Sequence, residues 1–88
     1  MISIKKIDTT HYQVNISKDG ETQHNVTLDT ETYRQITSEK ITPEELIKQS
    51  FIFLLERESN QSILRQFNLK VIKQYFPEYS VEIKKFLN

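Results

Sequence analysis

The sequence contains no cysteine, and Gly20 is its only glycine. The lack of cysteine excludes a disulfide framework and a thiolate metal site, and it suits a reducing cytoplasm. With a single glycine, the chain has no glycine-rich loop to cradle phosphate, no dinucleotide-binding fingerprint and no nucleophile elbow. Its core must therefore form by apolar packing alone, and the common nucleotide-binding motifs are excluded.

Long apolar runs are missing as well. The longest one, from Phe51 to Leu55, is far too short to cross a bilayer as a helix. The segment from Met1 to Lys6 has no apolar stretch of the kind found in signal peptides. The sequence therefore predicts a cytoplasmic protein that does not contact the membrane.

Neither sign of charge predominates, because 12 Lys and Arg residues balance 12 Asp and Glu residues. The charges are unevenly placed: residues 1–59 carry 7 basic and 10 acidic residues, whereas residues 60–88 carry 5 and 2. Such an imbalance is common on small domains, but a basic surface also attracts phosphate or an acidic partner. The candidate nucleic-acid contacts are Arg65, Lys70, Lys73, Lys84 and Lys85.

The first third of the chain is rich in β-branched residues, which favour strands. Turn-forming sequences, Asp-Thr-Thr and Lys-Asp-Gly-Glu, separate the segments 2–7, 12–17 and 22–28. These three segments predict an antiparallel β-meander.

Side-chain alternation determines how the second and third strands pair. A three-residue turn over residues 18–20, with Gly20 in the left-handed position of a G1 bulge, keeps the apolar residues on one face. The resulting register pairs Tyr12 with Val26 and Val14 with His24.

The only histidines are His11 and His24, and a metal site or general base would need one of them. In the predicted register they lie on opposite faces of the hairpin. His24 is expected to be half-buried beside Val14, and His11 to be solvated. A two-histidine metal site is therefore not expected.

From Asp29 onward the pattern becomes helical. Asp29 or Thr30 can cap a short helix that ends near Ile36. The sequence Thr-Pro-Glu-Glu at 42–45 combines an N-cap threonine with proline at the first helical position, and predicts a helix from Pro43 to about Glu58. Apolar residues cover about half the circumference of this helix. It is therefore the predicted central packing element, with Phe51 and Leu54 in the core.

Three shorter helices complete the predicted fold. One begins at Ser59 or Ser62 and runs through Phe67, another runs from Asn68 to Phe76 before Pro77, and the last begins at about Ser80. The fold class is α+β: a three-stranded antiparallel meander (residues 1–28) with a C-terminal helical layer (residues 29–88) packed on one face. Residues 1–88 form a single domain, as their number suggests.

Several patterns in the sequence carry a resemblance. They are Ser-Phe-x-Phe-Leu-Leu-x-Arg-Glu at 50–58, Ser-Ile-Leu at 62–64, Phe-x-Leu-x-Val-Ile at 67–72 and Tyr-Phe-Pro-Glu-Tyr at 75–79, together with Tyr-x-Val at 12–14 and Thr-Pro-Glu-Glu-Leu at 42–46. With these patterns the chain resembles a family of small bacterial proteins that has no assigned activity. The resemblance implies one intact domain in a bacterial cytoplasm, and it assigns no functional residues.

The polar residues form no recognisable catalytic motif. The serines and threonines have no histidine–acid context, and Glu44 and Glu45 are explained by the start of the long helix. Arg57, flanked by Glu56 and Glu58, projects toward the apolar face. Either it pairs with a carboxylate or carbonyl of a neighbouring segment, or it binds an anion. We predict no catalytic residue, no cofactor and no metal ion.

Two surfaces are candidates for binding. Tyr75, Phe76 and Tyr79 form either an aromatic recognition patch or a plug of the core around a helix-ending proline. Residues 62–76 loosely resemble a helix-turn-helix in which Lys70 and Lys73 face the major groove. Against DNA binding, the first helix is short, its turn lacks glycine and basic residues are few.

The favoured function is a small non-catalytic protein-interaction module or accessory subunit, which binds another protein or a second copy of itself. A basic-faced nucleic-acid-binding or regulatory protein that uses the helices of residues 62–85 is the alternative, and an enzyme is not expected. The interaction hypothesis requires an exposed apolar patch. The nucleic-acid hypothesis requires the basic residues of the last third to converge on one surface.

Overall fold

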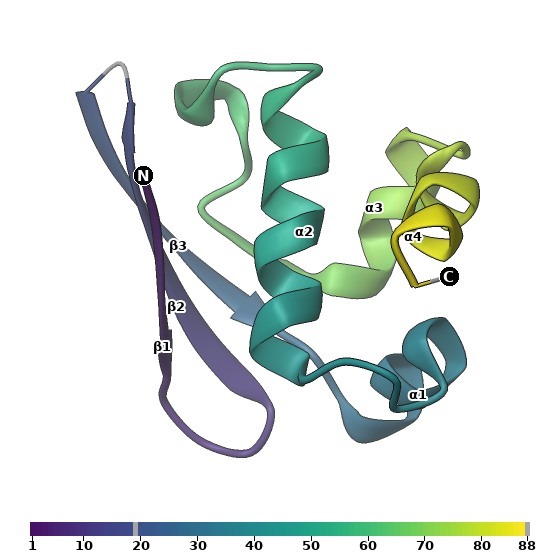
Figure 1. Ribbon diagram of the computed structural model, residues 1–88. Coiled ribbons are helices and arrows are strands. Elements are labelled where there is room, and N and C mark those ends of the chain that lie inside the picture. The colour runs from purple at the N-terminus through teal and green to yellow at the C-terminus, as the bar shows by residue number, and fades with distance from the viewer. Residues whose placement is uncertain (19, 88) are drawn as a thin grey trace.

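The protein, described here from a computed structural model, folds into a four-stranded sheet with helices on one face (Figure 1). The structure describes residues 1–18 and 20–87. The strands lie in the spatial order β1-β2-β3-β4, and they are β1 (Ile2–Lys6), β2 (His11–Lys18), β3 (Gly20–Thr27) and β4 (Gln66–Asn68). The predicted antiparallel meander of β1, β2 and β3 is confirmed. The sheet is mixed, however, because β4 pairs parallel to β3.

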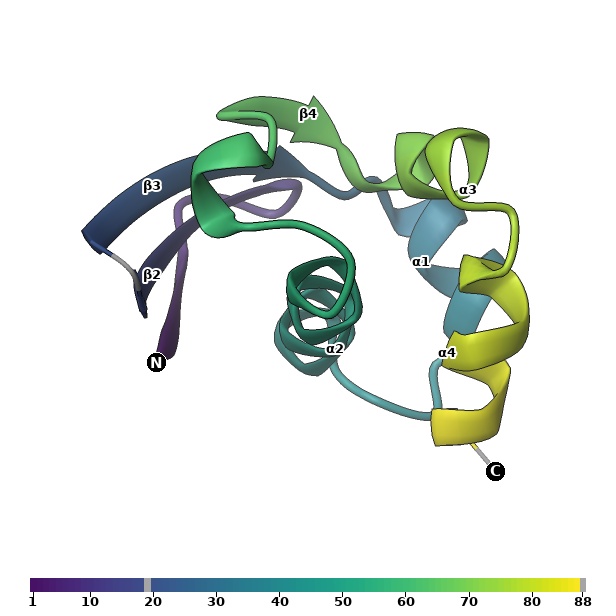
Figure 2. The ribbon, with the colours of Figure 1, turned by 90° about the horizontal axis from the view of Figure 1, so that it is seen from above.

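The predicted register of the hairpin is confirmed, since Tyr12 faces Val26 and Val14 faces His24. Gly20 has a φ of 90°, a backbone conformation that side chains with a Cβ rarely adopt. The predicted G1 bulge also involves Asp19, which lies outside the described residues. Side chains of the outer face of the hairpin are polar, as in Asn15 and Gln23, and no helix covers them in Figure 2.

Two helices begin where their caps predict. In α1 (Thr30–Thr37), the carboxylate of Asp29 accepts a hydrogen bond from the backbone N–H of Thr32 at 2.7 Å. In α2 (Pro43–Leu55), the hydroxyl of Thr42 accepts one from the N–H of Glu45 at 3.1 Å. Each bond satisfies a backbone donor that has no partner within its helix.

The helix predicted from Ser59 or Ser62 to Phe67 is wrong. A single 3-10 turn, η1 (Asn60–Ser62), is followed by an extended segment that leads into β4. The free edge of β3 explains the difference: the N–H of Asn25 bonds the carbonyl of Arg65 at 2.8 Å, and Val26 lies beside Phe67. The loose resemblance of residues 62–76 to a helix-turn-helix is therefore not matched by the structure, because the first helix is absent.

The rest of the chain is helical in short pieces: η2 (Leu69–Val71), α3 (Ile72–Tyr75) and α4 (Tyr79–Leu87). The side chain of Asn68 caps η2 through the N–H of Lys70 at 3.0 Å, at the predicted position. Phe76, the residue before Pro77, has a non-helical ψ of 87°.

Among the described residues, no helix has the length and apolar character that crossing a membrane would require.

The core lies on both sides of α2, which is seen end-on in Figure 2 between the sheet and α4. Phe51 and Leu54 are buried, as predicted. The ring of Phe51 packs against His24 of β3 and Phe67 of β4, with centroids 5.5 and 5.9 Å apart. On the opposite flank of α2, the hydroxyl of Tyr79 lies 2.6 Å from that of Ser50. α2 is thus the element that joins the sheet to the outer helices.

Candidate functional site

An apolar cavity of about 210 Å³ opens between the C-terminal end of α2, the segment before β4, and the helical pieces η2 and α3. We call it the α2–α3 pocket. Its apolar lining is formed by Leu54, Ile63, Leu64, Phe67, Val71, Ile72, Tyr75 and Phe76, and its polar lining by Glu58 and Ser62.

Two large side chains of this lining remain accessible to solvent. Leu64 is 51% exposed, in the extended segment that leads to β4, and Tyr75 is 66% exposed at the end of α3. Deeper lining residues such as Leu54, Ile63 and Ile72 are buried in the core. The pocket is therefore an opening into the core, with apolar side chains at its rim.

Glu58 places a single carboxyl group in this apolar lining. It follows α2, and its backbone N–H bonds the carbonyl of Leu54 at 2.9 Å. Burial raises the pKa of the Glu58 carboxyl, because the charged form is less well solvated there. Within the part of the chain that the structure describes, no cation forms an ion pair with it. The pocket thus offers an apolar surface and one negative charge.

A buried polar cluster holds the wall of the pocket onto β3. His24 was predicted to be half-buried but is 0% exposed. Its Nδ1–H donates to the carbonyl of Leu64 at 2.8 Å, and its Nε2 accepts from the hydroxyl of Thr22 at 2.9 Å. Burial lowers the pKa of His24, so the neutral imidazole that these bonds require is the favoured form.

Asn60 extends this cluster from η1. Its side-chain amide donates to the Thr22 hydroxyl at 3.1 Å and to the carbonyl of Gly20 at 3.3 Å. Asn60, Leu64 and Glu58 are not among the site residues that the sequence predicts. A weak signal exists only for Asn60, since asparagine favours turns through side-chain bonds to nearby backbone.

Arg57 lies outside the pocket and has partners in its own surroundings. Its guanidinium donates to Glu78 at 3.0 Å, to the carbonyl of Phe53 at 3.0 Å and to Glu56 at 3.4 Å. It also stacks 3.6 Å from the centroid of the Phe53 ring. These contacts favour the structural interpretation of Arg57, since Glu78 belongs to a neighbouring segment. A backbone hydrogen bond and the Arg57 side chain lower the pKa of Glu78.

Of the three residues of the candidate aromatic patch, Tyr79 belongs to the core, which agrees with the alternative of a plug around the helix-ending proline. Tyr79 is 2% exposed, and its hydroxyl donates to that of Ser50, which in turn donates to the carbonyl of Leu46. Burial raises the pKa of Tyr79 to about 12. Tyr75 is exposed and Phe76 is half-buried in the pocket lining. Only these two can contact a partner in this conformation.

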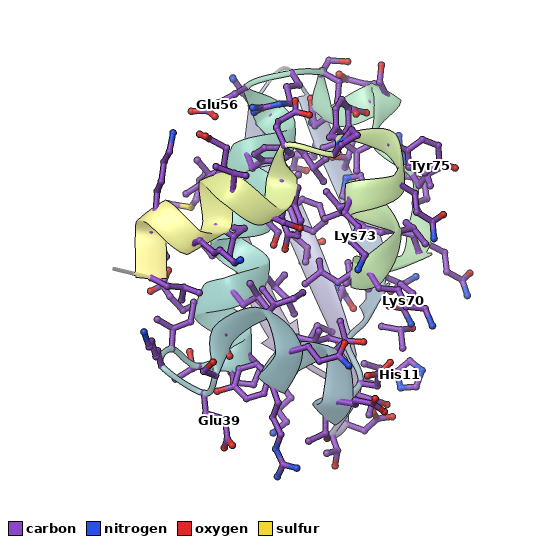
Figure 3. All side chains as sticks on the ribbon, turned by 90° about the vertical axis from the view of Figure 1, so that its right-hand side faces the viewer. His11, Glu39, Glu56, Lys70, Lys73 and Tyr75 are labelled. Atoms are coloured by element: carbon purple, nitrogen blue, oxygen red, sulfur yellow. The ribbon has the colours of Figure 1, made fainter. Side chains whose placement is uncertain are left out.

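All five candidate basic residues are exposed. Lys70 and Lys73 lie on η2 and α3, on the same side of the molecule as Tyr75 (Figure 3). Arg65 immediately precedes β4. Lys84 and Lys85 lie on α4, which extends toward the other side of that view, and Lys85 pairs with Glu82 at 3.1 Å. Lys70, Lys73 and the exposed Tyr75 therefore lie on one side of the molecule (Figure 3).

The other histidine, His11, is exposed on the sheet face opposite His24, as predicted. Its Nδ1 lies 2.9 Å from Asp8, and hydrogen bonds from Thr10 and then His11 lower the pKa of Asp8 to about 2. In the described ranges 1–18 and 20–87, no group of three or more metal-ligating side chains comes together.

A second hollow, of about 490 Å³, lies at the hairpin end of the sheet. Polar residues of the uncovered face line it, namely Ser3, Asn15, Ser17, Glu21 and Gln23, together with Met1, Ile16 and Thr22. Among the described residues, no basic side chain lines it. The α2–α3 pocket is the better candidate site, because most of its lining residues are apolar and it contains a partly buried carboxyl group.

Comparison with known proteins adds no further assignment. No family model, no curated protein and no solved structure matches the chain. The resemblance to a family of small bacterial proteins therefore depends on the sequence patterns alone and stays a prediction.

Proposed function

We propose that this protein is a small, non-catalytic interaction module of the cytoplasm, which binds a segment of another protein in the α2–α3 pocket. The observation that carries the proposal is the pairing of accessible apolar side chains, Leu64 and Tyr75, with an opening into the core. Exposed apolar surface of this kind is costly in water, and it is typical of sites that a partner covers.

The size of the pocket favours a side-chain anchor over a small ligand. Small-molecule sites commonly enclose about 300–1,000 Å³. The α2–α3 pocket, at about 210 Å³, is smaller than that range. One large apolar side chain of a bound segment fits this volume better than a cofactor.

The charge in the pocket specifies the second feature of the partner. Burial disfavours the Glu58 carboxylate, and among the described residues no basic side chain neutralises it. A Lys or Arg next to the apolar anchor of the partner would pair with it in a partly desolvated setting, where such pairs select one partner over another. We therefore expect the bound segment to combine a large apolar residue with a basic one.

A peptide display library tests the proposal directly. Random peptides selected on the intact protein should be enriched in a large apolar residue close to Lys or Arg. Leu64→Ser should weaken this binding at least about tenfold, since it removes an apolar contact at the rim. Glu58→Gln should relax the preference for the basic residue.

Val81→Ser is the matched control, because Val81 is a similarly exposed apolar residue on α4, outside the pocket lining. This variant should bind the selected peptides like the unmodified protein. The proposal fails if no peptide is enriched, or if Leu64→Ser and Val81→Ser bind the enriched peptides equally well.

Nucleic-acid binding is the second candidate, supported by the grouping of Lys70 and Lys73 with the exposed Tyr75 (Figure 3). An aromatic ring on the same side of a protein as two cations is a simple platform for a single strand. Micromolar binding of a single-stranded oligonucleotide at about 150 mM salt, lost on Lys70→Glu with Lys73→Glu, would replace the first proposal. Contacts to so few phosphates give a shallow salt dependence and weak binding.

A further inference from the structure

β1 is an edge strand that is paired on one side only. The sheet order places β1 at one end, beside β2, and no other strand among the described residues pairs with it. Its five residues, Ile2–Lys6, contain no proline or glycine. Natural edge strands are usually protected by proline, by charged side chains, by bulges or by a covering loop, because a free edge accepts another strand. In β1 the charged residues are Lys5 and Lys6 at its C-terminal end, and they restrict the registers in which a second strand can pair.

The hydrogen bonds to β2 identify the backbone groups that face the free edge. The N–H of Ser17 bonds the carbonyl of Met1 at 2.9 Å, and the N–H of Ile7 bonds the carbonyl of His11 at 2.8 Å. In an antiparallel pair, residues bonded to the neighbour alternate with residues that point away from it. Odd-numbered residues of β1 therefore bond to β2, and Ile2, Ile4 and Lys6 direct their N–H and C=O groups outward.

An apolar flank accompanies this free edge. Ile2 and Ile4 are half-buried on the helix-covered face of the sheet, and α2 packs against β1. Figure 2 shows the N-terminal strand and α4 on opposite sides of α2. On the helix, Ile52 lies away from Ser50, which contacts α4, and is 37% exposed. A second strand at this edge would lie beside Ile2 and Ile4.

We propose that β1 pairs antiparallel with β1 of a second copy of this chain, so that one continuous sheet passes through both copies. Such an interface is isologous, because the same strand serves both sides of a two-fold axis. Paired residues of antiparallel strands point to the same face. The helices of both copies therefore lie on one side of the joined sheet, and their α2 flanks approach each other.

The pattern of β1 is self-complementary in one register. With Ile4 opposite Ile4 of the partner subunit, all five residues pair, and every outward N–H and C=O meets a group of the other strand. Ile2 then lies opposite Lys6 of the partner subunit, and no lysine faces a lysine. A shift that places Lys5 opposite Lys5 of the partner subunit would create a repulsion. Charge repulsion thus disfavours that shift, and the larger number of paired residues favours the fully overlapping register.

Pairing at β1 leaves the α2–α3 pocket open. The pocket is lined by Leu54 and by residues 58–76, on the side of α2 that faces β4 rather than β1. A dimer would therefore present two pockets to its partners, and a protein with repeated binding segments would gain avidity. The self-association itself does not depend on the function proposed for the pocket.

The test is the molar mass as a function of concentration, measured by sedimentation equilibrium up to about 1 mM, which corresponds to weak association. The unmodified chain should approach twice its mass of 10.5 kDa. Lys6→Pro removes one outward N–H from each copy without removing a bond to β2. It should raise the dissociation constant at least about tenfold.

Lys6→Ala is the matched control, because it removes the same side chain and retains the N–H. It should dimerise like the unmodified chain. In a measurement that needs no variant, the amide hydrogens of Ile4 and Lys6 should exchange more slowly with solvent as the protein concentration rises.

Three results would overturn the proposal. They are a monomer at about 1 mM, equal dimerisation of Lys6→Pro and Lys6→Ala, and a dimer in which the Ile4 and Lys6 amides stay unprotected. If Lys6→Pro fails to fold, the exchange measurement on the unmodified chain decides alone. Pairing of β1 with a strand of another protein, in place of a second copy, would also refute it.

Discussion

The β1–β3 meander and the segment from Ser59 to Asn68 pack against the same helix, α2, but different forces hold them. Long antiparallel ladders and buried apolar side chains hold the meander. The segment depends on a short parallel pairing with β3 and on the polar cluster around His24 and Asn60. Such bonds are individually worth only about 0.5–1.5 kcal/mol. The segment, and with it the wall of the pocket, is therefore expected to open before the meander does.

Phe51→Ala should destabilise both the meander and the segment from Ser59 to Asn68. The Phe51 ring contacts His24 in the meander and Phe67 in the segment, so its removal leaves a cavity between them. We expect a loss of about 3–5 kcal/mol, a large part of the stability of a domain this small. Denaturant unfolding measures it. Ile52→Ala, at the neighbouring exposed position, is the control, and a loss below about 1 kcal/mol for Phe51→Ala would mean that the core is misplaced.

His24→Gln should affect the segment more than the meander. It disrupts the bond to the Leu64 carbonyl, at a cost of about 1–3 kcal/mol if that group stays buried. Hydrogen exchange should then accelerate first at the Asn25 amide, which bonds Arg65. Equal acceleration throughout β2 would contradict the two-region description.

Lowering the pH should destabilise the protein through the same residue, His24. Burial lowers the pKa of His24 in the folded state, so the folded protein resists a proton that the unfolded chain accepts near pH 6.5. The contribution of neutral His24 to the free energy of unfolding is fully present above pH 6.5, and it is lost as the pH decreases below that value. Urea unfolding at pH 7 and pH 5 should show this loss in the unmodified chain and in His11→Gln, but not in His24→Gln.

Glu58→Gln should change the free energy of unfolding least, and it should increase it where the other substitutions decrease it. Burial raises the pKa of Glu58, so its ionisation opposes folding above the folded pKa and has no effect below the unfolded value of about 4.5. The variant should be slightly more stable at pH 7 and equal to the unmodified chain at pH 3. Glu21→Gln, at an exposed position on β3, is the control variant.

The same contrast explains which elements could be predicted. The hairpin register follows from alternation between Tyr12 and Ile16, and the helix starts follow from Asp29 and Thr42, because each signal involves residues close in sequence. Residues 62–67 carry a pattern that also suits a helix. Their extended structure depends on the free edge of β3, which lies far away in the chain and is invisible to local propensity.

The candidate site shows a similar division. The contact of Arg57 with a neighbouring carboxylate was among the sequence-based alternatives, since a long cation at a helix end reaches such groups. Periodicity could not distinguish Tyr75 from Tyr79, because both flank the same proline. Their exposures of 66% and 2% result from the bend at Phe76 and from the hydroxyl of Ser50 on another helix.

By itself, the sequence determined the class of the fold, the meander and its register, the starts of α1 and α2, and the buried face of α2. These features follow from side-chain periodicity and from caps that act over a few residues. Only the tertiary structure decided the parallel strand β4, the burial of His24 and Tyr79, and the pocket that contains Glu58. Each of these depends on groups that meet across long separations, where burial and unpaired backbone determine the free energy and local preference contributes little.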